Sequence, residues 1–201
     1  MKATELLRTQ HEEIRELFEK VEEAESDGEK LRLFEELAVN LVAHDAIERE
    51  IFYPACEEEM GMDDVLGESL VEHGLIEFAL FRADQNFGTD AFDHYLSVLI
   101  ETVEHHVEEE EAEYLPKVER AFSNERLDDL GLEMEARFDE AKLEDFRSAL
   151  MENLEDVVAG ARKISAEAEK KPAKKRTSAT GNGRSNGSKK GRAGHARAHH
   201  H

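Results

Sequence analysis

The chain has 201 residues, of which 48 are acidic and 26 basic, so its formal net charge at pH 7 is −22. Residues 170–201 contain ten Lys or Arg and no Asp or Glu, which leaves residues 1–169 with a net charge of −32. A body this acidic repels DNA and RNA. The single cysteine, Cys56, excludes an internal disulfide and a thiolate-rich metal cage. The N-terminus is charged and no stretch approaches ~20 apolar residues, so we expect a cytoplasmic protein without membrane contact.

Residues 1–122 contain four segments in which apolar residues recur at alternating steps of four and three, the spacing of one helical face. Turn-forming residues separate the segments at 26–28, 61–64 and 88–90. Helices joined by such short loops favour antiparallel neighbours. We therefore predict an all-α fold, with an up-down-up-down four-helix bundle over residues 1–122. Each helical face also carries a histidine: His11, His44, His73 and His106.

Two further regions follow the predicted bundle. Residues 123–169 again show helical spacing, from Leu127 to Val157, but carry only carboxylates of the kind found on surfaces. We predict C-terminal helices there, which either cover the bundle or form a dimer; the oligomeric state stays open. Residues 170–201 are basic, rich in Gly and Ser, and almost free of large apolar residues. A segment of this composition cannot bury a core, so we predict a disordered basic tail.

The sequence repeats itself with an offset of 62 residues. The offset superimposes six polar positions and two prolines in pairs: His11 and His73, His44 and His106, Glu48 and Glu110, Pro54 and Pro116. Apolar positions follow the same offset. The two halves are therefore predicted to be helix pairs of one design, related by a pseudo-twofold axis.

The polar residues of the repeat lie on helical faces that are otherwise apolar. Burying four imidazoles and two carboxylates is costly unless they are paired or bind a cation. Within each half a His precedes a Glu by one helical turn, so both side chains can reach one metal centre. Mixed imidazole and carboxylate donors suit iron, manganese or zinc. We predict a two-metal site with these ligands: His11, His44, Glu48, His73, His106 and Glu110.

The order His, His-x3-Glu, His, His-x3-Glu resembles the hemerythrin-like, or HHE cation-binding, family over about residues 4–122. The segments HDAIEREIFYP (44–54) and HHVEEEEAEYLP (105–116) carry the resemblance. It implies two iron ions in a four-helix bundle, joined by an oxo or hydroxo bridge. His11 and His44 would hold one iron, His73 and His106 the other, and Glu48 and Glu110 would bridge them. Ferritin-like sites, by contrast, use Glu-x-x-His pairs, which no histidine before residue 123 forms.

One position departs from the oxygen-carrying hemerythrins, which place a second histidine one turn after the histidine of the third helix. Glu77 stands there in this chain. One iron would then have an open position, a water ligand, or Glu77 as an additional ligand. The counterpart of Glu77 in the first half is Arg15, which argues against ligation. The departure disfavours simple oxygen carriage.

The leading functional prediction is a di-iron protein that binds or senses a small oxidant: dioxygen, nitric oxide or peroxide. Binding is favoured over enzymatic turnover, although handling of peroxide or nitric oxide stays open. Two alternatives remain, namely a metal- or redox-responsive regulator that contacts DNA or an acidic partner through residues 170–201, and an iron-buffering protein.

Four other residues of reactive type are assigned structural places. His105 is interpreted as a surface or supporting residue, because its repeat counterpart is Ala43. Tyr53 and Tyr114 are expected to pack the end of the bundle, and Cys56 to be a small core residue. The alternatives are a tyrosine near the metals that quenches or relays radicals, and a redox role for Cys56.

Overall fold

The computed structural model describes residues 1–62 and 64–170, and the side chains of these as far as residue 158. Over this part of the chain the fold is all-helical. The helices are α1 (Ala3–Glu23), α2 (Asp27–Ile47), α3 (Tyr53–Met60), α4 (Asp64–Gln85), α5 (Asp90–Glu109), α6 (Leu115–Ala121), α7 (Asn124–Ala141) and α8 (Phe146–Lys170), with π-helical turns η1 (Glu48–Phe52) and η2 (Glu110–Tyr114).

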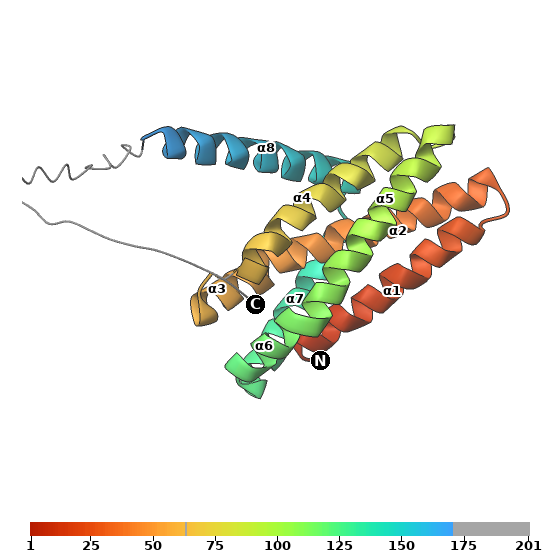
Figure 1. Cartoon of the computed structure of the whole chain (residues 1–201). Helices are drawn as coiled ribbons and strands as arrows, with labels where there is room; N and C mark the ends of the chain where they lie inside the picture. Colours follow the sequence, from red (N-terminus) through yellow and green to blue (C-terminus); the bar gives the residue numbers. More distant parts are fainter. Residues whose placement is uncertain (63, 171–201) are drawn as a thin grey trace, which may run out of the picture.

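The predicted four-helix bundle is confirmed. Its members are α1, the continuous run α2–η1–α3, α4, and the continuous run α5–η2–α6, which lie side by side in Figure 1. The chain turns between them near the predicted positions. Ser26 caps α2 by accepting a hydrogen bond from the backbone N–H of Glu29. Gly61 and Gly88 adopt φ values of 80° and 78°, which few residues other than glycine tolerate.

The predicted C-terminal helices are also confirmed, and they cover the bundle unequally. Helix α7 packs against α1 and α2, whereas α8 packs across α4 and α2. Gly131 allows α7 to approach the start of the chain, because a Cβ atom there would collide with the backbone of Met1. Among the described residues, neither α7 nor α8 packs extensively against α5. Residues 171–201 of the predicted basic tail lie outside the described residues.

Each of the two long runs contains a π-helical turn at the same place in the repeat. The backbone N–H of Tyr53 donates to the carbonyl of Glu48, and that of Leu115 donates to the carbonyl of Glu110. A proline stands two residues after the end of each turn, at Pro54 and Pro116. Because proline has no N–H and its ring clashes with the preceding helical turn, a widened turn there lets the helix continue.

The core consists of two apolar clusters with a polar layer between them. One cluster contains Ile14 and Leu41, and the other contains Leu7 and Ile47. Since His11 lies between Leu7 and Ile14 in the sequence, its helical position places it in the layer between the clusters. No helix among residues 1–62 and 64–170 is long and apolar enough to cross a membrane.

Candidate metal centre

Four histidines, one from each member of the bundle, meet in the polar layer. The exposed fractions of His11, His44, His73 and His106 are 0%, 6%, 5% and 3%. Their rings are close neighbours: the centroids of His11 and His44 lie 4.9 Å apart, and those of His73 and His106 lie 4.6 Å apart. The structure thus brings together the four predicted imidazoles, in the two pairs that the repeat predicted.

Glu48 lies between the two histidine pairs. Its Oε2 atom is 3.2 Å from Nε2 of His44 and 3.3 Å from Nε2 of His73. Two groups of ligand atoms, each within 4.8 Å of one another, share this carboxylate: His11, His44 and Glu48 form one, and Glu48, His73 and His106 form the other. A carboxylate shared in this way is placed to bridge two metal ions.

Glu110 lies beside Glu48 at the same level of the bundle. Its Oε2 atom is 3.4 Å from Nε2 of His11. Burial, together with the neighbouring charge of Glu110, raises the pKa of Glu48 well above its ordinary value. Burial also lowers the pKa of His44 well below its ordinary value. Two adjacent buried carboxylates require a compensating positive charge.

The outward nitrogen of each histidine is held by a partner from another part of the bundle. Nδ1 of His11 donates to Glu111 at 2.9 Å, and Nδ1 of His44 donates to Gln10 at 2.8 Å. Nδ1 of His73 donates to Asp45 at 2.6 Å, and Nδ1 of His106 donates to Glu72 at 2.9 Å. These acceptors place the proton on Nδ1 and leave the Nε2 lone pair directed inward. This is the usual arrangement around metal-binding histidines.

Replacement of Asp45 by Asn should weaken metal binding on the His73 side of the centre by about 10- to 100-fold, the usual cost of losing such a partner. Asp45 also accepts from the side-chain amide of Asn153 in α8, so it anchors His73 to the covering helix. Metal affinity measured by competition with a chelator tests this. Asp93→Asn, at an exposed carboxylate of α5, is the control and should leave the affinity unchanged. An unchanged affinity in D45N would contradict the role.

The geometry of the inward nitrogens fits a metal ion. Nε2 of His73 and Nε2 of His106 lie 3.1 Å apart. With both protons on Nδ1, two lone pairs face each other and repel. Two imidazole nitrogens bound at right angles to one ion, at ~2.1 Å each, would lie ~3.0 Å apart. Five buried atoms of the centre also have no hydrogen-bond partner among the described residues: Nε2 of His11, Nε2 of His44, both carboxylate oxygens of Glu48, and Oε2 of Glu110.

Tyr53 belongs to the centre, although we expected it to pack the bundle end. Its hydroxyl lies 3.0 Å from Nε2 of His73 and 3.4 Å from Oε1 of Glu110. Five residues of regular α-helix turn by about 140° beyond one full rotation, which would direct Tyr53 away from Glu48. The π-helical turn between them brings Tyr53 back to the same face. The prolines at 54 and 116 were the only sequence signal of that turn.

Glu77 lies outside both groups of ligand atoms. Its carboxylate forms an ion pair with Arg49 at 2.9 Å. The repeat-related positions form a second ion pair with the two charges exchanged: Arg15 stands at the position of Glu77 and lies 3.5 Å from Glu111, which stands at the position of Arg49. The structure therefore places Glu77 in a flanking ion pair, as its counterpart Arg15 suggested. Its role as an additional ligand stays a prediction.

The stability of metal-free protein should depend on pH through Glu77. Burial and the neighbouring Asp45 raise its pKa from 4.5 to about 8, although Arg49 opposes the shift. The folded state therefore binds the proton of the Glu77 carboxyl group more tightly than the unfolded state does. The stabilisation that protonated Glu77 gives the fold is full below pH 4.5 and is lost as the pH rises through 8. Urea unfolding of metal-free protein from pH 6 to 9 should show a smaller loss of stability for Glu77→Gln than for wild type. Parallel pH profiles would contradict this, and Glu16→Gln, at an exposed carboxylate, is the control.

The remaining residues of reactive type lie where the sequence suggested, with Tyr53 the exception. The side chain of His105 is 62% exposed, with Glu72 and Glu109 as neighbours. Cys56 is fully buried, and burial raises the pKa of its thiol to about 12. Tyr114 is buried against Phe52.

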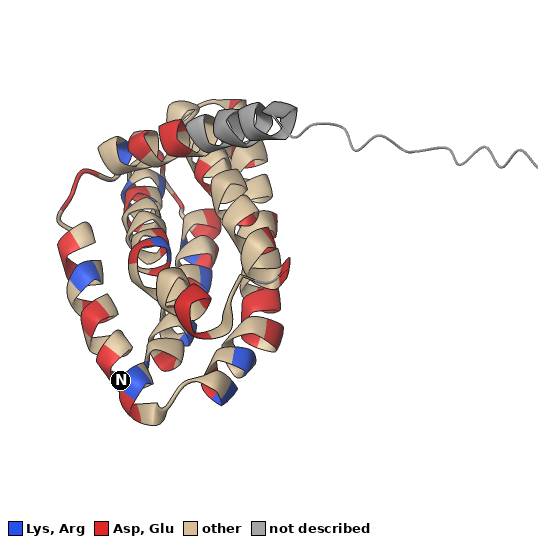
Figure 2. Cartoon of the chain, turned by 90° about the vertical axis from the view of Figure 1, so that its left-hand side faces the viewer, with Lys and Arg blue, Asp and Glu red and all other residues tan. Residues whose placement is uncertain are grey.

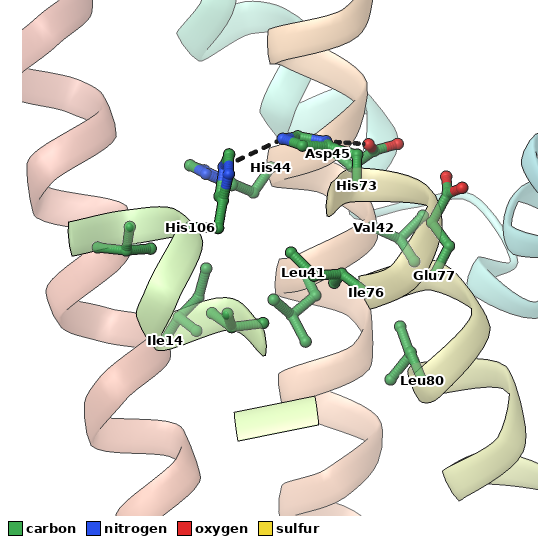
Figure 3. A pocket seen from close by; sticks show the side chains of 12 residues that line it. Ile14, Leu41, Val42, His44, Asp45, His73, Ile76, Glu77, Leu80 and His106 are labelled. Carbon is green, nitrogen blue, oxygen red and sulfur yellow. Dashed lines mark hydrogen bonds and ion pairs between the residues drawn. The ribbon is translucent and has the colours of Figure 1, made fainter. Parts of the chain in front are cut away.

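A small cavity adjoins the centre. It has a volume of about 30 Å³, and three of the histidines form part of its wall, which is otherwise mostly apolar. Figure 3 shows His44, His73 and His106 at one side of this pocket, with Leu41, Ile76 and Leu80 around the remainder. A volume of this size holds one or two small molecules such as water or a diatomic gas.

Comparison with known proteins agrees with these observations. The Hemerythrin HHE cation binding domain matches residues 2–118. The fold is similar to a crystal structure of a hemerythrin HHE cation binding domain-containing protein from Mycobacterium kansasii, at a TM-score of 0.64 and 25% sequence identity. That similarity covers 77% of this chain and 99% of the other. A comparison with curated proteins gives no significant match. The chain belongs to the hemerythrin HHE cation-binding domain family.

Proposed function

We propose that this chain binds two iron ions at the centre and uses them to bind or sense a small oxidant: dioxygen, nitric oxide or peroxide. The apolar cavity beside the histidines is the observation that carries the oxidant part of the proposal. The mixed imidazole and carboxylate donors support iron, which they suit together with manganese and zinc.

The two groups of ligand atoms support the ligand roles of the four histidines and Glu48, and the role of Glu110 rests on the family resemblance. His11 and His44 would hold one iron, and His73 and His106 the other. Glu48, which belongs to both groups, and Glu110 would bridge the pair, with an oxo or hydroxo group completing the bridge. Iron supplies the reversible change of oxidation state and the affinity for small diatomic ligands. Asp45, Glu72, Glu111 and Gln10 fix the orientation of the imidazoles.

The cavity sets the size and polarity of the ligand. Its volume of about 30 Å³ suits one or two small molecules, and its mostly apolar lining disfavours ions. Tyr53 contributes one hydrogen-bond donor at the edge of the centre. Burial, together with the charges of Glu110 and Glu48, raises the pKa of Tyr53 well above its ordinary value, so its hydroxyl stays protonated near neutral pH. A neutral diatomic molecule meets these conditions best.

Filling the cavity should block the ligand without removing the iron. Ile76→Phe places extra volume in the cavity wall, whereas Leu75→Phe adds the same group at the next residue, which is 56% exposed. In iron-loaded protein, anaerobic optical titration with nitric oxide, dioxygen and peroxide should show binding in wild type and L75F. I76F should keep its iron and lose at least about tenfold in ligand affinity, because ~1.4 kcal/mol of steric cost suffices.

Two results would overturn the proposal. One is iron analysis far below two ions per chain after anaerobic loading with ferrous iron. The other is equal ligand binding by I76F and wild type, which would show that the ligand does not occupy the cavity. The regulator and iron-buffer alternatives stay predictions.

A further inference from the structure

A second set of metal-ligand side chains lies at the surface, between α4 and α5. It consists of Glu72, His105 and Glu109, whose ligand atoms lie within 4.8 Å of one another. Nε2 of His105 is 3.5 Å from Oε1 of Glu72 and 3.7 Å from Oε1 of Glu109. The exposed fractions of the three side chains are 15%, 62% and 42%, in the order Glu72, His105, Glu109. Solvent therefore reaches this triad, whereas the histidines of the centre are buried.

Glu72 belongs to both sets of residues. While Oε1 faces His105, Oε2 accepts the hydrogen bond from Nδ1 of His106 at 2.9 Å. That hydrogen bond holds the carboxylate of Glu72 in place. One side chain thus connects the exposed triad to a ligand of the buried centre.

The internal repeat provides a comparison within the molecule. At the positions 62 residues earlier stand Gln10, Ala43 and Ile47. Gln10 also holds a histidine of the centre, but Ala43 and Ile47 are fully buried in the cluster that α7 helps to form. The orienting role at position 72 therefore needs neither His105 nor Glu109. Only the half of the bundle that α7 leaves open carries these two additional donors.

Stabilisation of the fold does not account for the triad. Exposed ion pairs of this kind contribute little to the stability of a fold. An imidazole one helical turn from a carboxylate, facing a second carboxylate from the neighbouring helix, is instead a donor set for a divalent transition-metal ion. Residues 1–169 carry a net charge of −32, and Figure 2 shows acidic positions along several of the helices. This charge raises the local concentration of such ions.

We infer that Glu72, His105 and Glu109 form a third metal site, which takes a divalent ion such as Mn²⁺ or Fe²⁺ from solvent ahead of its transfer to the buried centre. The transfer of an ion from the surface site to the centre is inferred from the carboxylate of Glu72, which contacts both His105 and His106. An ion at the surface site and an ion beside His106 repel each other and compete for the negative charge of Glu72. The surface site therefore binds best when the centre is empty, and its affinity falls once the centre is filled. Only this transfer role rests on the proposed function.

The site itself is tested by counting bound Mn²⁺. Full-length metal-free protein is titrated with Mn²⁺, and free Mn²⁺ is measured by electron paramagnetic resonance. His105→Ala should bind one ion fewer than wild type, or bind that ion at least about tenfold more weakly, as loss of a partner of a metal site commonly costs. His94→Ala, which removes another exposed histidine of α5, should match wild type. Residues 171–201 are the same in all variants, so any Mn²⁺ that their histidines bind does not change the difference between variants. Equal counts and affinities in H105A and wild type would overturn the site.

The transfer role is tested by the rate at which the centre fills. The chain has no tryptophan, and Tyr53 contacts His73, so quenching of tyrosine fluorescence by Co²⁺ reports entry into the centre. H105A and Glu109→Gln should fill several-fold more slowly than wild type and H94A, yet reach the same final quenching. An unchanged rate in both variants would overturn the transfer role. If the centre binds no metal while the Mn²⁺ count still differs, the proposed function fails and the surface site stands.

Discussion

Removal of the bound metal should lower the melting temperature of the protein by about 10 °C. Four imidazoles and two carboxylates lie in one buried layer, and five of their polar atoms have no hydrogen-bond partner among the described residues. A metal present at a thousandfold excess over its dissociation constant stabilises the folded state by ~4 kcal/mol. For a chain of this length each kcal/mol corresponds to about 2–4 °C. Differential scanning calorimetry with and without a chelator measures the shift.

His73→Ala distinguishes stabilisation by metal bound at the centre from general stabilisation of the protein by ions in solution. The variant lacks one ligand, so added metal should raise its melting temperature far less than that of wild type. His94→Ala, at an exposed histidine, should respond as wild type does. A chelator that leaves the melting temperature of wild type unchanged would show that the buried layer is stable without a cation.

Glu48→Gln should have opposite effects on the two forms of the protein. Because Glu48 belongs to both groups of ligand atoms, its loss should reduce bound metal from about two ions per chain to fewer than one. The melting temperature of metal-loaded protein should therefore fall. Burial and the charge of Glu110 raise the pKa of Glu48, which means that its ionised form destabilises the metal-free fold. At pH 8, metal-free E48Q should consequently melt higher than metal-free wild type.

Matched variants make this reversal specific to Glu48. Glu108→Gln, at an exposed position near Glu110, should change neither form. Glu110→Gln should weaken metal binding less than E48Q does, because Glu110 belongs to neither group of ligand atoms. Retention of two ions by E48Q would mean that the carboxylate is not shared between them.

Most of the fold was predictable because it depends on local patterns. The spacing of apolar residues predicted the four bundle helices, and the turn residues near Gly61 and Gly88 predicted their ends. The 62-residue repeat then selected His106 over His105, since a core position in one half implies a core position in the other. The structure agrees, with His106 buried and His105 exposed.

The surroundings of the centre were not predictable from those patterns. Asp45 holds His73 across two helices, and Glu77 pairs with Arg49 of another helix. The first contact does not follow the repeat, because the counterpart of Asp45 is Val107. The second contact recurs at the repeat-related positions, but with its two charges exchanged. Helical periodicity gives the direction of a side chain around its own helix. It does not give the partner that a neighbouring helix offers.

The sequence by itself determined which four histidines and two glutamates lie in one layer, because six polar residues on apolar helical faces have few alternatives to a common site. Tertiary structure decided the rest. A widened turn, which lets each proline lie within a continuous helix, added Tyr53 to the centre. The packing of the four helices left the apolar cavity, and the one-sided cover of α7 left Glu72, His105 and Glu109 open to solvent. Each of these depends on how separate helices fit together, which is a property of the packed core.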